Sequence, residues 1–445
     1  MARKHESGEQ NSSDRQMPPQ QNQSDRQPPL RFPWGVFFVS LFAFPVSYVL
    51  SLSSAMEDSR WVFVAGVGAL TAMLPLTYLC VVRGSGSRRD IYFYIFTLFA
   101  FTSMVDLALA LTIDGHTSLL LFYCREGEVY LTTAHGLWIN YWDGSFHYAC
   151  YLLLTVCLLR GDSYAAPWFR VVGLIWGGSI LNSMICLFTA SAVGTHAQQI
   201  KPSYLLNIPY GLFPLIFVGR VWRARPETVL AETPASRLQL DSTRRDERKP
   251  LWVWPIDALL IVAAFLCSCI CVLRALVVLR SRLPLAEHYG AAFEPHLQDP
   301  TAYPTLQMLT YFFYLVPYLA WACLQLWSGV SAQPLLDAGA AARFRDATQL
   351  DAGSARFRDV TLLVVGALLQ GSFSYVGAAL HEGGAFPHKD WRRQSTEGLA
   401  WWVFVGVNAV MLLTPILILV RVSIKAARNQ ITAAPDKDAA RAKTQ

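Results

Sequence analysis

Residues 130–159 read "YLTTAHGLWINYWDGSFHYACYLLLTVCLL", a stretch long enough to cross a bilayer as one helix. Inside it, Asp143 and His147 lie four residues apart, which is about one turn of a helix. A carboxyl and an imidazole at this spacing can hydrogen-bond to each other, which lowers the cost of burying both. The stretch therefore predicts a membrane helix whose polar side chains face a bundle interior or a wet cavity.

The polar residues of this helix form a continuous stripe. At about 100° per residue, one narrow face collects Gly136, Asn140, Asp143, His147 and Cys150. The neighbouring side chain of Tyr141 points elsewhere. Asp143 follows the start of the stretch by about 13 residues, which places it near the middle of the membrane at about 1.5 Å per residue.

The whole chain has the composition of a polytopic membrane protein. It has 445 residues, of which 53% are hydrophobic and 15% are charged. The sequence predicts an all-α fold with about ten transmembrane helices, at 33–54, 60–82, 91–113, 130–159, 168–190, 203–222, 252–279, 303–327, 360–380 and 399–422.

The basic residues predict the topology. An even number of helices leaves both termini on one face, and that face carries most of the 37 Lys and Arg. We therefore expect cytosolic termini. The opposite face, called the lumenal face below, has only Arg60, Arg125, Lys201, Arg280, Arg282, Lys389, Arg392 and Arg393. Topology and solvation account for the basic residues, and no basic module with interleaved aromatic residues predicts nucleic-acid binding.

Two segments indicate an internal repeat. "NIPYGLFPLIFVGRV" begins at Asn207 and "NAVMLLTPILILVRV" begins at Asn408, each with a proline seven residues later. We also align Tyr130, Tyr141 and Cys150 with Tyr303, Tyr314 and Cys323. Two four-helix repeats with the same orientation explain these matches, because an even number of helices per repeat preserves orientation.

The predicted organisation has six parts. They are a disordered cytosolic tail (1–31), two N-terminal transmembrane helices (33–82), a first four-helix repeat (91–222), a charged cytosolic linker (223–250), a second four-helix repeat (252–422) and a cytosolic tail (423–445). A short duplication within 337–358 predicts an inserted cytosolic loop.

Three interpretations of the polar stripe remain open. Asp143 and His147 join Asn182 or Asn207 as interhelical hydrogen bonds, or they line a cavity for the polar head of a lipid or sterol. In the third, the pair moves a proton within a hydrophobic ligand. Asp106 is the natural partner from a neighbouring helix.

Other charged residues have simpler explanations. Glu126 and Glu128 are expected to be solvated at the lumenal mouth, and Asp257 and Arg274 to snorkel from opposite ends of their helix. The chain has no Walker loop, GxSxG, HExxH or Rossmann fingerprint. Its nine cysteines do not have metal-site spacing, so we expect no metal and no cofactor.

The motifs "EGEVYLTTAHGLWINYWDGSFHY", "NIPYGLFPLIFVGRVW" and "EPHLQDPTAYPTLQMLTYFFYLVPY" resemble the transmembrane 6 superfamily, which has ten helices and tandem EXPERA domains. "FPVSY" (44–48), "FTSMVDL" (101–107) and "TAHG" (133–136) resemble the member 2 branch more than the member 1 branch. EXPERA domains also occur in the emopamil-binding-protein sterol isomerases and the sigma-2 receptor, where a helical cavity holds a sterol or an amphipathic amine.

The resemblance implies a set of ligand-binding residues, which we predict as Asp106, Asn140, Tyr141, Trp142, Asp143, His147, Asn182, Asn207 and Asn408. Catalytic residues are expected only if the protein is an isomerase, in which case they are Asp143 and His147. The second repeat departs from the isomerase pattern, with Met411 where Trp is expected, Val316 and Ala320 aligned with the Asp–His pair, and Tyr375 in place of His.

The resemblance further implies a non-enzymatic function in lipid metabolism. We expect binding or transfer of a lipid or sterol, lipidation and secretion of triglyceride-rich lipoproteins, and control of lipid-droplet content. The expected partners are lipoprotein-assembly proteins, in the membranes of the endoplasmic reticulum and its Golgi-intermediate compartment, with the lysosomal membrane as the alternative. The alternative functions are a sterol Δ8–Δ7 isomerase and a scaffold that recruits a lipid-handling partner through residues 223–250.

Overall fold

The computed structural model describes residues 33–83, 90–224, 255–331, 340–381 and 398–433, with side chains described outside 328–354 and 425–433. The predicted tail 1–31 lies outside these residues, as do nearly all of the linker 223–250 and most of the tail 423–445. The described part is all-α and contains no strand, which confirms the predicted fold class.

Nine helices of the described part are long and apolar enough to cross a membrane: Trp34–Ser51, Ser59–Val82, Tyr92–Ile113, Pro167–Val193, Pro202–Arg223, Pro255–Val278, Tyr303–Trp327, Ala355–Leu380 and Leu399–Ile424. The remaining predicted span is a continuous helical run, Ala134–Leu159, whose residues 143–147 form a π-helical turn. It packs against its neighbours in the same bundle, so its polar side chains are buried by protein.

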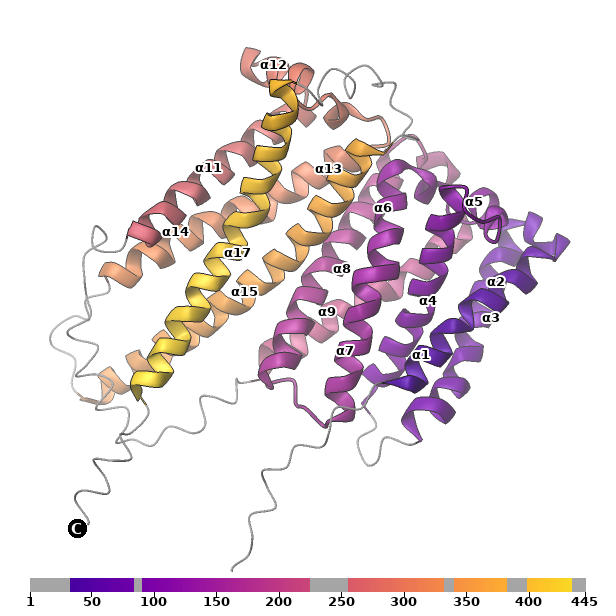
Figure 1. Ribbon diagram of the computed structural model, residues 1–445, viewed down its shortest axis with the longest axis horizontal. Helices are drawn as coiled ribbons and strands as arrows, with labels where there is room; N and C mark the ends of the chain where they lie inside the picture. Colours follow the sequence, from indigo (N-terminus) through magenta and orange to yellow (C-terminus); the bar gives the residue numbers. More distant parts are fainter. Residues whose placement is uncertain (1–32, 84–89, 225–254, 332–339, 382–397, 434–445) are drawn as a thin grey trace, which may run out of the picture.

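The two N-terminal helices cover one side of the first repeat. They comprise α1 (Trp34–Leu41), α2 (Ala43–Ser51) and α3 (Ser59–Thr77), which all pack on α4 and lie at the right edge of Figure 1. Gly35 allows α1 to approach the next helix closely, because a Cβ there would overlap the carbonyl oxygen of Cys80.

The first repeat begins with α4 (Tyr92–Ile113), followed by the short helix α5 (Leu121–Glu126) and the 3-10 turn η4 (Val129–Thr132). The polar span then runs through α6 (Ala134–Trp142), η5 (Asp143–His147) and α7 (Tyr148–Leu159). The repeat ends with α8 (Pro167–Val193), η7 (Pro202–Asn207) and α9 (Ile208–Arg223). Aromatic side chains fill its core, with Phe217 in edge contact with Tyr92, Phe96 and Trp176.

The second repeat has the same order of elements. It consists of α11 (Pro255–Val278), α12 (Pro284–Ala292), the 3-10 turn η10 (Pro295–Gln298), α13 (Tyr303–Thr310), η11 (Tyr311–Leu315), α14 (Val316–Ser331), α15 (Ala340–Leu380) and α17 (Leu399–Ala433). The two repeats stand side by side with their short helices α5 and α12 toward the same end (Figure 1).

Each repeat has a π-helical turn at the corresponding place. In η5 and η11 the helix widens for five residues between two α-helical segments. Aligning the repeats on these turns would place Tyr311 and Leu315 opposite Asp143 and His147, five residues before the Val316 and Ala320 of the sequence alignment. In either register the second repeat has no Asp–His pair at this place.

The predicted loop at 337–358 is also wrong for most of its length. Residues 340–380 form a single helix of 41 residues, so the second copy of the duplication continues directly into the membrane helix. The duplicated segment is rich in Ala and Arg, which are strong helix formers. Residues 332–339 lie outside the described part.

The repeats meet along α8 and α15, which lie side by side at the centre of the bundle (Figure 1). Two glycines permit this close crossing, since a Cβ on Gly178 would overlap the carbonyl oxygen of Leu363 and a Cβ on Gly366 that of Ile175. The flanking contacts are also reciprocal, because α15 packs on α6 and α8 packs on α13. The two repeats are thus related by an approximate two-fold arrangement.

Candidate functional site

Asp143 and His147 form the centre of a buried hydrogen-bond network. The Nδ1 atom of His147 lies 2.6 Å from Oδ1 of Asp143, and Ser103 donates to Oδ2 at 2.6 Å. The side chain of His147 is 1% exposed. The π-helical turn places both residues on the side that faces α4.

The other imidazole nitrogen also has a partner, because Nε2 of His147 lies 2.7 Å from Oγ of Ser179. The indole N–H of Trp142 can only donate, and it donates to the same hydroxyl at 2.8 Å. The Ser179 hydroxyl therefore contacts both Trp142 and His147, and each imidazole nitrogen has a side-chain partner.

A close approach between η5 and α4 brings the polar residues of α4 to the pair. Gly144 of η5 allows it, since a Cβ there would lie 2.6 Å from Cβ of Leu107. The carboxyl of Asp106 then interacts with that of Asp143, as the sequence predicted for a partner from a neighbouring helix. Asp143 therefore has polar neighbours from α4 as well as from its own helix.

The remaining predicted site residues lie in other clusters. Asn182 is at the boundary between the repeats, where it donates to Gln370 at 2.6 Å and to Gln307 at 3.2 Å. Tyr141 points toward the lumenal end and donates to Asp114 at 2.5 Å. Asn140 is 2% exposed, and its side-chain nitrogen has no partner among the described residues.

Glu128 is buried, which corrects the expectation that it is solvated. It is 4% exposed and accepts a hydrogen bond from Tyr130 at 2.5 Å and another from Asn207. Burial raises the pKa of Glu128 from 4.5 to about 7, although these hydrogen bonds oppose the rise. Glu126 pairs with Lys201 at 2.7 Å in a partly exposed position, which agrees with the expectation for that residue.

The second repeat holds an analogous cluster in which a fully buried arginine takes part. Arg274 pairs with Glu294 and donates to Oδ1 of Asn408 at 3.0 Å, and Tyr289 donates to the same carboxylate at 3.0 Å. Glu294 follows α12 by two residues, as Glu128 follows α5. The predicted snorkelling of Arg274 is therefore wrong, because its guanidinium lies beside a buried carboxylate.

Asp257 does not snorkel either. It is 1% exposed and pairs with Arg421 at 2.7 Å, joining the first and last helices of the second repeat. An ion pair with full hydrogen bonding removes the need for either charge to reach water.

A pocket of about 360 Å³ opens at the lumenal end of the first repeat. Its lining comes from α4, α5, η4, α6 and the end of α15, through Thr112, Ile113, Leu121, Cys124, Thr132, Ala134, Leu137 and His381. His381 lies 3.6 Å from Asp114, the acceptor of the Tyr141 hydroxyl. Asp143 and His147 do not line it.

The structure therefore divides the predicted site. Asp106, Trp142, Asp143 and His147 come together, whereas Asn182, Asn207 and Asn408 belong to three other polar clusters. The sequence did not predict Ser103 and Ser179, which complete the central network, because a serine in an apolar helix has no distinct sequence signal. Within the described ranges, no group of three or more His, Cys, Asp or Glu side chains is placed to hold a metal ion.

Comparison with known proteins places the chain in a family of membrane proteins. Residues 42–231 match the family "Transmembrane 6 superfamily member 2-like, transmembrane domain". Human transmembrane 6 superfamily member 2 is 33% identical over 349 residues, covering 77% of this chain and 81% of the relative.

Rodent relatives match over a larger share of the chain. The rat protein of the same name is 33% identical and the mouse protein 32%, each covering 86% of this chain and 90% of the relative. No solved structure matches the chain significantly. The identity and coverage of these relatives establish that the chain belongs to the transmembrane 6 superfamily and is similar to its member 2.

Proposed function

We propose that this protein binds a lipid or sterol within the membrane and transfers it to a lipoprotein-assembly partner. In this proposal it acts in the membranes of the endoplasmic reticulum and its Golgi-intermediate compartment. There it supports lipidation and secretion of triglyceride-rich lipoproteins and controls lipid-droplet content. The resemblance to the transmembrane 6 superfamily supports this setting.

The observation that carries the proposal is the pocket at the lumenal end of the first repeat. Its volume of about 360 Å³ lies within the range of small-molecule sites. Its walls combine apolar side chains such as Ile113, Leu121 and Leu137 with a few polar ones, including Thr132 and His381. An amphipathic molecule at the membrane surface has the same combination of apolar body and polar head.

The Asp143–His147 network favours binding over catalysis. A proton-transfer pair needs an atom that can reach the ligand, but both nitrogens of His147 contact protein side chains, as do both carboxylate oxygens of Asp143. This arrangement supports a positioning role for the network, in which Trp142 and His147 hold their helix in a fixed position relative to Ser179 of α8. The isomerase reading becomes an outcome of the test below.

The proposal is tested by filling the pocket in the full-length protein. Cys124→Phe places a ring in the pocket lining, and Cys80→Phe is the matched control because Cys80 is exposed and does not line this pocket. We expect mass spectrometry to find a lipid class that co-purifies with the wild type and with Cys80→Phe and is reduced at least fivefold in Cys124→Phe. Triglyceride secretion by cells that express each variant should follow the same order.

An identical lipid profile in all three proteins, with each variant folded, would contradict lipid binding at this pocket. Conversion of a Δ8-sterol by purified wild type, lost in His147→Ala, would replace the proposal with an isomerase. Fluorescence microscopy of the tagged chain checks the compartment, and a lysosomal distribution would contradict the proposed one.

A further inference from the structure

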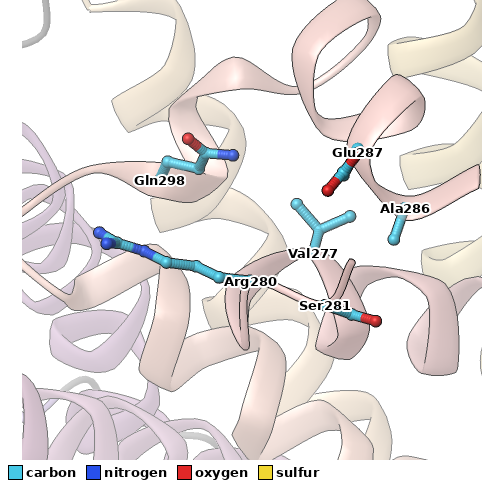
Figure 2. Close-up of a pocket in the computed structure, with 6 residues that line it drawn as sticks. All are labelled: Val277, Arg280, Ser281, Ala286, Glu287 and Gln298. Atoms are coloured by element: carbon cyan, nitrogen blue, oxygen red, sulfur yellow. The ribbon is translucent and has the colours of Figure 1, made fainter. Parts of the chain in front are cut away.

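The second repeat has its own lumenal pocket, of about 330 Å³. Figure 2 shows its lining, which consists of Val277, Arg280, Ser281, Ala286, Glu287 and Gln298. These residues come from the end of α11, from α12 and from η10. Both pockets are lined by the end of the first helix of the repeat and by the short helix that follows it, so they occupy corresponding places, although α6 and His381 also line the first one.

The helix ends at the two pockets have the same backbone geometry but different residues. In the first repeat, Gly115 ends α4 with φ of 77° and donates to the carbonyl of Thr112 at 3.1 Å. In the second, Arg280 ends α11 with φ of 55° and donates to the carbonyl of Val277 at 2.9 Å. Glycine is the usual residue at such a left-handed helix end because it has no Cβ.

An arginine in this conformation has a conformational cost, which indicates that its side chain has a use there. The Arg280 side chain is exposed and, in Figure 2, extends away from Val277 on the side of Gln298, opposite Glu287. Arg280 has no ionic partner among the described residues. It is also one of only eight basic residues on the lumenal face. A cation held at this place is suited to an anionic group such as phosphate.

The opposite charge is present in the same pocket. Glu287 projects from α12 on the other side of Val277, is exposed and likewise has no ionic partner in the described part of the chain. Gln298, which lies on the same side of Val277 as the guanidinium, offers an amide, and Ser281 adds a hydroxyl at the other edge of the pocket. Gly290 keeps α12 close to α11, since a Cβ there would lie 2.7 Å from Val277.

The surroundings of the pocket are apolar. Leu279, Leu283 and Leu285 are exposed next to its charged residues. In a membrane protein such side chains at a helix end lie against the acyl region of the nearest leaflet. The pocket thus combines a cation, an anion and a hydrophobic rim, and a ligand that matches all three is a phospholipid with a zwitterionic headgroup.

We propose that the pocket between α11, α12 and η10 binds the zwitterionic headgroup of a phospholipid from the lumenal leaflet. Arg280 contacts the phosphate, Glu287 contacts the choline or ethanolamine nitrogen, and Gln298 hydrogen-bonds to the phosphate oxygens. The acyl chains leave along the three exposed leucines. This inference rests on the proposed lipid-handling function and names the lipid class for the second repeat.

The test uses full-length protein in detergent and dihexanoyl-phosphatidylcholine as the probe, with native mass spectrometry to measure affinity. Arg280→Gly restores the glycine found in the first repeat, so it should fold at least as well as the wild type. We expect it to lower the affinity at least tenfold. Arg282→Gly, a change of an exposed arginine in the same loop that does not line the pocket, should change the affinity less than twofold.

Glu287→Gln separates the two charges of the headgroup. It should lower the affinity for dihexanoyl-phosphatidylcholine at least fivefold. The affinity for the anionic dihexanoyl-phosphatidic acid should stay within twofold of the wild-type value or become tighter. Equal affinities in wild type and Arg280→Gly would overturn the proposal. Equally tight binding of glycerophosphocholine, which has no acyl chains, would overturn the lipid source and indicate a soluble phosphodiester ligand.

The failure of this inference is distinguishable from failure of the proposed function. If Arg280→Gly retains the probe while Cys124→Phe loses its co-purifying lipid, only the second-repeat site is wrong. If neither variant changes lipid binding, the lipid-handling function is wrong as well.

Discussion

Gly178 and Gly366 occupy equivalent positions on the two central helices, and each admits the backbone of the opposite helix. Gly178 faces Leu363 and Gly366 faces Ile175, and each glycine follows its own helix's contact residue by three positions. The crossing is therefore built twice from the same pattern. Close backbone approach is a common basis of helix association in membranes, because lipid supplies little hydrophobic drive between helices.

A methyl group at either glycine should separate the repeats. Gly178→Ala or Gly366→Ala should each lower the free energy of unfolding by about 1–3 kcal/mol, because the new Cβ meets backbone that has no rotamer to change. Thermal unfolding of detergent-purified protein measures the effect. Gly406→Ala is the control, since nothing lies within 4 Å of its Cβ. Equal stability of Gly178→Ala and the control would refute the close crossing.

The ion pair of Arg170 and Asp359 also joins the repeats. Arg170 is 3% exposed, donates from Nε to Asp359 at 2.8 Å, and donates to the carbonyl of Val221 at 2.7 Å. Arg170→Leu should destabilise the protein by about 3–5 kcal/mol, because it leaves Asp359 buried without its counter-ion. Chemical unfolding monitored by tryptophan fluorescence provides the measurement.

Two further variants give this prediction its controls. Arg170→Leu combined with Asp359→Leu should recover part of the lost stability, since no charge is then left alone. Arg220→Leu removes an exposed arginine that lies 3.7 Å from Asp90, and it should cost about 1 kcal/mol or less. A double variant less stable than either single variant would show that the pair is not the source of the effect.

The Asp143–His147 network predicts strong coupling between its members. Asp143→Asn and His147→Gln should each destabilise the protein, and a double-mutant cycle should give an interaction free energy of about 1–3 kcal/mol. The reason is that each change leaves the partner's hydrogen bonds unmade in a buried site. Stability effects that add within about 0.5 kcal/mol would contradict the network.

Glu128 should make stability depend on pH. Because burial raises its pKa to about 7 from 4.5, the folded protein retains a proton that the unfolded chain has released between these values. Stability should therefore fall as pH rises from about 4.5 to about 7, by up to about 1.4 kcal/mol per pH unit, and then stay level above that window. Glu128→Gln should flatten this part of the profile, which thermal unfolding at a series of pH values would measure.

The sequence predicted the membrane helices well because hydrophobic runs of fixed length have few alternatives in a bilayer. It also predicted that Asp143 and His147 are buried together. Contacts between helices were harder to predict, because no sequence pattern indicates the partners of Ser103, Ser179 and Gln307. The pairing of Glu294 with Arg274 was missed for the same reason, because it depends on how α12 folds back over the end of α11.

The π-helical turn in each repeat was not predicted from the sequence. Neither turn has a composition that distinguishes it from an ordinary helix. The prediction of a loop at 337–358 was wrong because it rested on the duplication and on the position between two spans. The residues of this segment favour a helix, which the structure shows from residue 340.

The reciprocal crossing of α8 and α15 has a consequence for the origin of the chain. Two repeats that contact each other through equivalent surfaces are expected when the gene of a symmetric homodimer is duplicated and fused. After fusion the copies are free to diverge, which accounts for an Asp–His pair in one half and an arginine-centred cluster in the other. An ancestral chain of this kind would contain one four-helix unit and would assemble as a dimer.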